Sequence, residues 1–400
     1  MHLTHLSLTN FRAFSRLDMD IPRRILLLVG DNAQGKTSLL EAIYFLATFS
    51  SFHTPSDRQL ISFLASAGEL AVTRITAQIQ KEKKTTKLEV RLIQENGGNG
   101  GWRLRKEILV DGSKRSMHEA LGQLNAVIFL PQMMRILEGS PDDRRRYINT
   151  VISQIMPGYA QALNDYSKAL DQRNALLKLL AERGGDPAQL DYWDNLLSER
   201  GALLVHARIL SLDELERIAT SIHQNLTQQQ EVLRLQYLPS YDPARLPEGQ
   251  FTLPLKTPVD RAGFSVDEIR DGFLKKLLVL RNEEIARGVT TIGPHRDELR
   301  VLGNGVDLGD YGSRGQIRTA LLAFKLAEVE WMKSKTGECP VLLLDETLVE
   351  LDSHRREDLL RYLENYEQAI LTTTDLNLFP PGFTSQCKLM DITLGKIKAR

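Results

Sequence analysis

Hydrophobic and polar residues alternate like those of strands over the first part of the chain. Apolar side chains are separated by polar ones in residues 3–11, and residues 25–29 form a continuous apolar run. Such a run predicts a strand that is buried on both faces of a mixed or parallel sheet. Residues 70–112 alternate again around a glycine-rich stretch at 96–101, which predicts an antiparallel hairpin with an exposed turn.

The pattern becomes helical in the middle of the chain. Between residues 157 and 225, apolar side chains recur at heptad spacing in two runs, which a Gly-Gly pair separates and Arg173 interrupts. This predicts a short antiparallel helical arm with a two-glycine turn at its tip. An ordinary pair of helices inside a lobe would give the same pattern. Further helices are predicted at 266–287 and 315–335.

The remaining segments alternate strands with helices, as in an α/β fold. The polar, proline-containing stretch at 239–258 is predicted to be a surface loop. We expect one lobe from residues 1–130 and 330–400, and an inserted, mainly helical lobe from residues 131–329. The other predicted elements are helices at 37–47 and 353–366 and strands at 232–238, 341–344 and 369–373.

Composition and charge leave the chemistry open. The chain has 51 Lys+Arg and 51 Asp+Glu, so its formal net charge is zero, and nucleic-acid binding would need a local basic face. Cys339 and Cys387 lie far apart, which argues against a disulfide framework or a zinc site. The first residues lack a signal-peptide pattern, and no apolar run approaches the ~20 residues that cross a bilayer. We expect a cytoplasmic protein without a membrane segment.

The sequence Gly30-Asp31-Asn32-Ala33-Gln34-Gly35-Lys36-Thr37 matches the P-loop pattern GxxxxGK[ST]. An apolar strand precedes it and a helical pattern follows, which favours a P-loop over a glycine-rich turn without a ligand. In such a loop, backbone N–H groups and the helix N-terminus bind phosphate oxygens. Lys36 is expected to reach the β- and γ-phosphates of ATP, and Thr37 to hold Mg²⁺ through its hydroxyl.

The apolar strand at 341–344 is followed by two acids, Asp345 and Glu346. A central strand of a doubly wound sheet ends beside the P-loop, so Asp345 is placed to hold Mg²⁺ and Glu346 to polarise the attacking water. Without the P-loop, the same pattern would indicate only a strand that ends in a solvated acid pair.

The tetrapeptide Ser313-Arg314-Gly315-Gln316 precedes a predicted helix, whose first amides would attract an anion. By itself it indicates no more than an N-cap with a surface arginine. However, it lies upstream of the Asp-Glu strand and of Glu350-Leu351-Asp352, which resembles the order of an ABC signature, a Walker B strand and a D-loop.

Further blocks resemble the RecF family, the SMC-like ABC ATPases of bacterial DNA replication and repair. The resemblance implies an ABC-type P-loop ATPase head with mixed sheets and an inserted helical lobe. General ABC transporters would not show Gly293-Pro294-His295-Arg296-Asp297. The other matching blocks are Leu8–Arg12, Ser51–Thr54, Asp57-Arg58, Leu60-Ile61, Gly139–Pro141, Arg144–Arg146, Ile292 and Thr372–Asp375.

The resemblance also implies site residues. Arg12 would lie near the phosphates, Gln132 would stand at the Q-loop position beside Mg²⁺, and Asp352 would be the D-loop aspartate. Ser313 and Gly315 would reach the γ-phosphate of ATP held by a second protomer, which implies a head-to-tail homodimer with two ATP molecules. Further nucleotide contacts are expected from Gly30, Asn32, Gly35 and Ser38, and Thr374 stands where transporters carry a switch histidine.

The function implied by the resemblance is an ATP-dependent clamp on DNA near single-strand gaps. With the partners RecR and RecO it would help to load the recombinase RecA, and weak, DNA-stimulated ATP hydrolysis would reset the clamp. Three departures from the family pattern stand out: Met133-Met134 where acids are usual, Val349 where Ser is usual, and Glu346 in place of a second Asp.

Composition does not itself indicate DNA binding. Basic clusters occur at 81–87, 103–106, 114–115 and 144–146, and each would more often be a solvated face. The arginines at 144–146 could equally pair with Asp142 and Asp143. The alternatives are a transporter ATPase subunit, a nuclease with an ABC head and a scaffold with an inactive ATP site.

Overall fold

The computed structural model describes residues 1–66, 70–82, 84–96, 102–244, 259–364 and 366–400. Residues 97–101 of the predicted glycine-rich turn at 96–101, Lys83 of the first basic cluster and most of the predicted loop at 239–258 therefore lie outside the described residues. The chain divides into two compact units, Met1–Met133 with Phe324–Arg400, and Met134–Ala323.

The first unit contains an antiparallel sheet, as the alternation at 70–112 predicts. Its six strands pair in the order β2-β1-β4-β5-β6-β7. One face of the sheet is buried and carries apolar side chains such as Ile75 and Val90. The other face carries mostly polar residues. The strands are β1 (His2–Phe11), β2 (Phe14–Asp20), β4 (Leu70–Lys81), β5 (Lys84–Asn96), β6 (Trp102–Val110) and β7 (Ser113–Arg115).

A second six-stranded sheet of the same unit has the order β15-β14-β3-β13-β12-β8, with every pair parallel except β14–β15. Its central strands β3, β13 and β12 are almost entirely buried, which confirms the prediction from the apolar runs of β3 and β12. The strands are β3 (Ile25–Val29), β8 (Ala126–Phe129), β12 (Val341–Asp345), β13 (Ala369–Thr373), β14 (Cys387–Thr393) and β15 (Lys396–Ala399).

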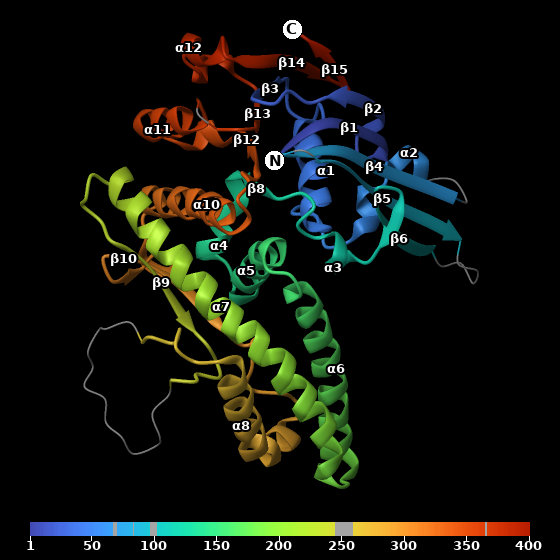
Figure 1. Cartoon of the computed structure of the whole chain (residues 1–400), viewed down its shortest axis with the longest axis vertical. Coiled ribbons are helices and arrows are strands. Elements are labelled where there is room, and N and C mark those ends of the chain that lie inside the picture. Colours follow the sequence, from blue (N-terminus) through green and yellow to red (C-terminus); the bar gives the residue numbers. More distant parts are fainter. Residues whose placement is uncertain (67–69, 83, 97–101, 245–258, 365) are drawn as a thin grey trace. The chain divides into compact units, whose positions relative to one another are not determined.

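Helix α1 (Lys36–Thr48) packs between the two sheets (Figure 1) and shares one core with both. Ten of its thirteen residues are buried, including Leu39, Ile43 and Leu46, so the helix that follows the phosphate loop is fixed from both sides. Shorter elements complete the unit: η1 (Asp57–Leu60), α2 (Phe63–Ser66), α3 (Met117–Ala120), η2 (Pro131–Met134), which ends in the second unit, η4 (Thr347–Glu350), α11 (Ser353–Glu364), η5 (Leu376–Leu378) and α12 (Pro381–Thr384).

The second unit is mainly helical. Helices α6 (Tyr159–Arg183) and α7 (Asp191–Leu226) run antiparallel from a turn at Gly184-Gly185, where both glycines have positive φ, and η3 (Pro187–Leu190) (Figure 1). A third helix, α8 (Val266–Arg287), packs against both, so the predicted helix pair belongs to a three-helix bundle. The other elements are α4 (Arg135–Glu138), α5 (Pro141–Ile155), α9 (Leu308–Tyr311), a sheet of β9 (Leu233–Leu238), β10 (Glu298–Gly303) and β11 (Val306–Asp307), and α10 (Arg314–Thr336), which ends in the first unit.

Arg173, which interrupts the heptad pattern, is fully buried inside this bundle. Its guanidinium forms ion pairs with Asp194 of α7 (2.7 Å) and Glu284 of α8 (2.7 Å), both also fully buried, and donates to the hydroxyl of Thr290 (2.9 Å). Arg281 adds a second cation to Asp194. The polar residue in an apolar stripe is thus the centre of an ionic contact between all three helices.

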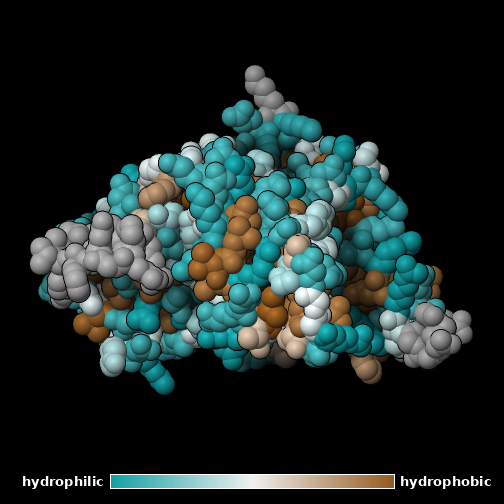
Figure 2. Space-filling view, turned by 90° about the horizontal axis from the view of Figure 1, so that it is seen from below, coloured by the Kyte–Doolittle hydropathy of each residue, from teal (hydrophilic) through white to brown (hydrophobic). Residues whose placement is uncertain are grey.

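Hydrophilic side chains dominate the surface seen in Figure 2, and its apolar residues lie in separate small groups. Among the described helices, none is long and apolar enough to span a membrane.

Candidate nucleotide site

The predicted phosphate-binding loop connects the end of β3 to the start of α1. Gly35, the residue before α1, has a φ of 110°, a conformation that side chains rarely adopt. A Cβ on Gly30 would lie 2.5 Å from the carbonyl oxygen of Ile392 on β14. The loop therefore requires glycine at both positions, for conformation at Gly35 and for close approach at Gly30.

Gln34 attaches this loop to the turn between β14 and β15. The backbone N–H of Leu394 donates to Oε1 of Gln34 (2.7 Å), and the N–H of Gly395 donates to the carbonyl oxygen of Gln34 (3.1 Å). Sequence reasoning did not identify this tether, which fixes the outer part of the loop.

Lys36 is the first residue of α1 and only 4% exposed. Its ammonium donates to the carbonyl oxygens of Gly30 (2.6 Å) and Asp31 (3.0 Å) and lies 3.0 Å from Oε1 of Glu346. The structure therefore brings together the predicted phosphate-binding lysine and the predicted catalytic glutamate. A phosphate bound over the loop would compete with these acceptors for the ammonium.

Asp345 ends the buried strand β12 and is held by two hydroxyl groups. Thr37 donates to Oδ2 (2.8 Å), and Thr372 of the neighbouring strand β13 donates to Oδ1 (2.7 Å). Parallel strands end at the same edge of a sheet, which explains why residues so far apart in sequence meet here. The predicted pair Thr37 and Asp345 thus lies side by side.

The amides, the hydroxyl and the carboxylate at this edge of the sheet suit a nucleotide with Mg²⁺. The first amides of α1 have no acceptor within the helix, and the helix N-terminus favours anions. The hydroxyl of Thr37 and Oδ2 of Asp345 are hard oxygen donors at the 2.8 Å spacing expected of two ligands on one small cation. In the part of the chain that the structure describes, no group of three or more His, Cys, Asp or Glu could hold a metal ion. Thr37 and Asp345 would supply two of the ligands of an Mg²⁺ ion that also binds phosphate oxygens and water.

The other residues assigned to the nucleotide differ in their surroundings. Arg12 forms a two-pronged ion pair with the buried Glu41 of α1 (2.8 Å for both hydrogen bonds), so this arginine is anchored to the helix that follows the loop. Asn32 and Gln132 are exposed, whereas Ser38 is half-buried.

The predicted D-loop follows η4. Asp352 accepts a hydrogen bond from the backbone N–H of Arg355 (3.0 Å) and pairs with its guanidinium, so Asp352 caps the N-terminus of α11. These interactions, the backbone hydrogen bond first, lower the pKa of Asp352 despite some desolvation. Arg356 donates to the carbonyl oxygens of Leu348 and Leu351, and the departure residue Val349 is 55% exposed.

The predicted signature residues belong to the second unit. Ser313 caps α10 by accepting from the N–H of Gln316 (3.2 Å), and the Gln316 side chain accepts from the N–H of Ser313 (3.0 Å). Ser313 and Gly315 are both exposed, and the side chain of Gln316 donates to Glu231 (3.0 Å). The local geometry is that of a capped helix N-terminus with accessible amides.

The Gly-Pro-His-Arg-Asp block is largely structural. Asp297 is buried against Arg208 (2.7 Å) and accepts from the N–H of Ser240 (2.9 Å). His295 contacts the hydroxyl of Tyr166 (2.6 Å), and burial lowers its pKa to about 4. Arg296 alone of the charged residues in the block is exposed. Sequence reasoning missed Arg208, because nothing near it in the sequence indicates a partner.

The cluster Arg144–Arg146 is also mostly structural. Arg144 forms a two-pronged pair with Glu298 (2.7 and 3.0 Å), and Arg145 pairs with Asp142 as the sequence allowed. Arg146 is exposed.

Three comparisons place this geometry among known proteins. A family model described as the RecF/RecN/SMC N terminal domain matches residues 2–389. The chain is 35% identical over 399 residues to the DNA replication and repair protein RecF of Enterococcus faecalis, with 100% of this chain and 99% of the relative covered. It is 37% identical over 409 residues to the protein of the same name from Chloroflexus aggregans, with both chains covered completely.

Among solved structures, the recombination mediator protein RecF of the RecFOR pathway in complex with ATP is 30% identical and superposes with a TM-score of 0.83. That alignment covers 100% of this chain and 97% of the other. The likeness extends over both units and confirms the ABC-type ATPase fold shared by RecF and SMC heads.

Proposed function

This chain belongs to the RecF family of DNA replication and repair proteins, and from that premise we propose that it is an ATP-gated clamp on DNA. The observation that carries the proposal is the convergence of Lys36, Thr37, Asp345 and Glu346 at one edge of the parallel sheet. Lys36 supplies a phosphate-binding ammonium, and Thr37 and Asp345 supply two Mg²⁺ ligands. Glu346 supplies a base for the attacking water.

ATP binding exchanges the contacts of Lys36. Its ammonium leaves Glu346 for the β- and γ-phosphates, and the freed carboxylate then orients water toward the γ-phosphate. Thr37 and Asp345 would hold Mg²⁺, which when bound would neutralise charge on the transferred phosphoryl group. Glu346 lies at the end of a buried strand, and its backbone conformation is left-handed, with a φ of 47°. Hydrolysis is slow and serves to reset the clamp.

The second half of each ATP site comes from another protomer. Ser313 and Gly315 are exposed at the N-terminus of α10, where amides of the first helical turn and the Ser313 hydroxyl can bind a γ-phosphate. Asp352 and the exposed Val349 lie at the D-loop and contribute to the same head-to-tail interface. ATP thus supplies contacts that stabilise a closed homodimer.

DNA binding is supported by the outer face of the antiparallel sheet. Arg74, Arg91, Arg105 and Lys114 are 37–69% exposed there. The carboxylates below them, Glu89 and Glu107, are at most 10% exposed. Four outward cations over two recessed carboxylates leave a positive surplus across about 14 Å, the width of three gaps between strands. We refer to Arg74, Arg91, Arg105 and Lys114 as the basic band.

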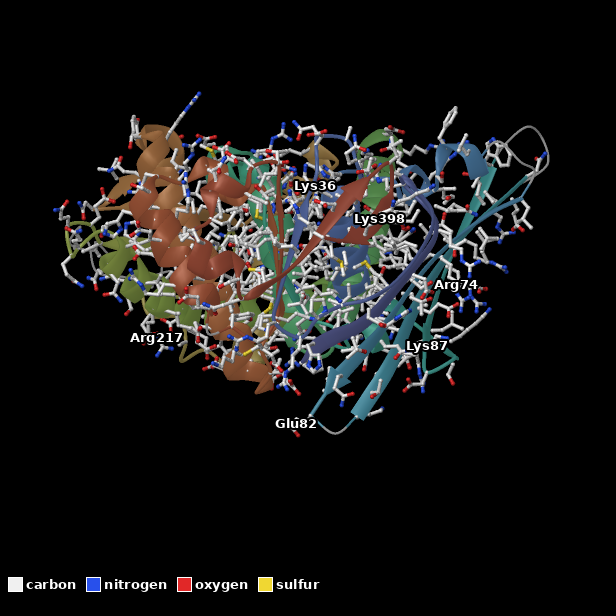
Figure 3. All side chains as sticks on the ribbon, turned by 90° about the horizontal axis from the view of Figure 1, so that it is seen from above. Lys36, Arg74, Glu82, Lys87, Arg217 and Lys398 are labelled. Carbon is white, nitrogen blue, oxygen red and sulfur yellow. The ribbon has the colours of Figure 1, made fainter. Side chains whose placement is uncertain are left out.

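Figure 3 shows Arg74 and nearby Lys87 on the strands of this sheet, with Lys36 elsewhere in the same unit. The band contacts backbone phosphates, so affinity falls steeply with salt and depends little on sequence. The DNA is a duplex next to a single-strand gap, and RecR and RecO act with the clamp to load RecA.

The first test uses Glu346→Gln, which keeps the shape of the site and removes the base. Binding to a gapped duplex is measured with Mg-ATP and with Mg-ADP, and oligomer mass is recorded on the same samples. We expect tight binding by a dimer in ATP only, and Lys36→Ala should remove it. Equal, weak binding with both nucleotides would refute the clamp and leave only the ATPase fold.

A second test addresses the basic band. Arg105→Glu with Lys114→Glu should weaken DNA binding and reduce the steepness of its salt dependence by about two released ions. Arg217→Glu, on the exposed side of α7, is the control with 71% exposure and no place in the band. An unchanged salt slope in the double variant would remove the band from the interface.

A further inference from the structure

Thr372 contacts both acids of the nucleotide site through one hydroxyl group. It is buried near the end of β13, opposite Asp345 in the parallel pairing of β12 with β13. The hydroxyl donates to Oδ1 of Asp345 (2.7 Å) and accepts from the backbone N–H of Glu346 (3.0 Å). Its donor and its acceptor capacity are therefore both used at the site.

The first of these bonds assigns different tasks to the two oxygens of Asp345. Oδ1 is occupied by Thr372, and Oδ2 is directed at the hydroxyl of Thr37. A carboxylate held at one oxygen cannot rotate freely about its Cβ–Cγ bond. Outer hydrogen-bond partners of this kind orient a ligand before the metal binds.

The second bond acts on the conformation of Glu346. This residue has φ 47° and ψ 21°, in the left-handed region that costs a non-glycine residue free energy. The N–H of Glu346 is held by Thr372, and its carboxylate lies 3.0 Å from Lys36. The hydroxyl of Thr372 therefore stabilises the turn that directs Glu346 toward the phosphate loop.

We infer that Thr372 is a positioning residue for ATP hydrolysis, which sets the orientation of the Mg²⁺-binding carboxylate and of the catalytic glutamate together. The inference rests on the proposed ATPase function. Thr372 acts through its hydrogen bonds with Asp345 and Glu346.

The neighbouring threonine provides a matched control. Thr373 is equally buried, but its hydroxyl donates to the carbonyl oxygen of Asp375 (2.8 Å) and accepts from the N–H of the same residue (3.0 Å). Thr373→Val thus removes a buried hydroxyl with two hydrogen bonds from the same strand without touching either acid.

The test compares Thr372→Val, Thr372→Ala, Thr372→Ser and Thr373→Val with the unchanged chain. Binding of a fluorescent ADP analogue is measured in EDTA and over a Mg²⁺ titration, and steady-state ATP hydrolysis is measured in parallel. In Thr372→Val and Thr372→Ala we expect unchanged affinity in EDTA and a Mg²⁺ midpoint raised about tenfold or more. Turnover should fall by a similar factor with little change in KM for ATP.

Thr372→Ser keeps the hydroxyl, so its Mg²⁺ midpoint and its turnover should stay within about threefold of the unchanged chain. Thr373→Val should match the unchanged chain in both assays. If Thr372→Val fails to fold, Thr372→Ala and Thr372→Ser still differ only by the hydroxyl. Equal Mg²⁺ midpoints and equal turnover for the Ala and Ser variants would overturn the inference. If the unchanged chain itself showed no Mg²⁺-dependent nucleotide binding and no ATP turnover, the proposed ATPase would be refuted, and the inference with it.

Discussion

Replacing Arg173 with methionine tests whether the buried ionic cluster stabilises the helical bundle. The guanidinium of Arg173 is fully buried between Asp194 and Glu284, which are themselves fully buried. Methionine keeps an unbranched apolar stem but is shorter and uncharged, so it leaves Glu284 without this cation and Asp194 with Arg281 alone. Removing one member of a buried ion pair typically costs about 3–5 kcal/mol, because a charge remains buried without its partner. We expect a loss of unfolding free energy in that range for the second unit.

The control is Arg217→Met on α7, where Arg217 pairs with Asp213 one turn away (3.0 Å) and is 71% exposed. An exposed pair of this kind contributes about 0.3–0.5 kcal/mol. Equilibrium unfolding in urea, followed by circular dichroism at 222 nm, reports mainly on helices, and both substitutions lie in helices of the same unit. A two-unit chain can unfold in steps, so midpoints are compared within one transition.

The double variant Arg173→Met with Glu284→Gln identifies the cause of the loss. Glutamine removes the stranded charge, and its side-chain oxygen can still accept the hydrogen bonds that Thr291 donates to Glu284. The double variant should therefore recover part of the stability lost by Arg173→Met. If Arg173→Met lost no more stability than Arg217→Met, the reasoning from burial would be refuted.

Three further predictions concern the phosphate loop, the D-loop and the half-buried His295. Gly30→Ala should reduce ATP affinity at least tenfold in a binding assay, because its Cβ would meet the Ile392 carbonyl at 2.5 Å; affinity equal to that of the unchanged chain would contradict the tight packing. Asp352→Ala should lower the thermal unfolding midpoint by removing the cap of α11, which is worth about 1 kcal/mol; Asp352→Asn, which can still cap, should restore most of it. His295 has a pKa lowered to about 4 by burial, so the unfolded chain binds the proton more readily and stability should fall as the pH drops from about 6.5 to 4. His295→Gln should lose that part of the pH dependence in urea unfolding. Tyr166, Arg145, Arg208 and Arg296 face His295 but do not titrate between pH 4 and 6.5, so an unchanged slope would show that other acids or histidines carry it.

The nucleotide site could be predicted from the sequence because its signals are local. The glycines, Lys36 and Thr37 stand within one loop, and the apolar run before Asp345 marks a central strand. Parallel strands end at one edge, so this pairing of loop and acids needed no further information. Helix α5 was missed although Ser140 and Asp143 form a capping box before an apolar pattern.

Other contacts could not be predicted because the two partners carry no common pattern. Arg12 was expected at the phosphates, yet its partner Glu41 gives no sign in the sequence that it is buried. Arg173 interrupts the heptad pattern, but one of its two acidic partners, Glu284, lies on α8, far away in the sequence. Such ionic contacts depend on tertiary packing, whereas helices and buried strands follow from local periodicity.

The parallel sheet takes its strands from both parts of the chain, since β3 lies between β13 and β14. The second unit, in contrast, is one continuous segment, Met134–Ala323. During synthesis, the helical unit can therefore fold while the phosphate loop still lacks β12 to β15 and the turn that tethers Gln34. A nascent chain can complete its nucleotide site only after β12 to β15 have left the ribosome, so a product truncated before β12 would carry the basic band without a complete phosphate-loop site.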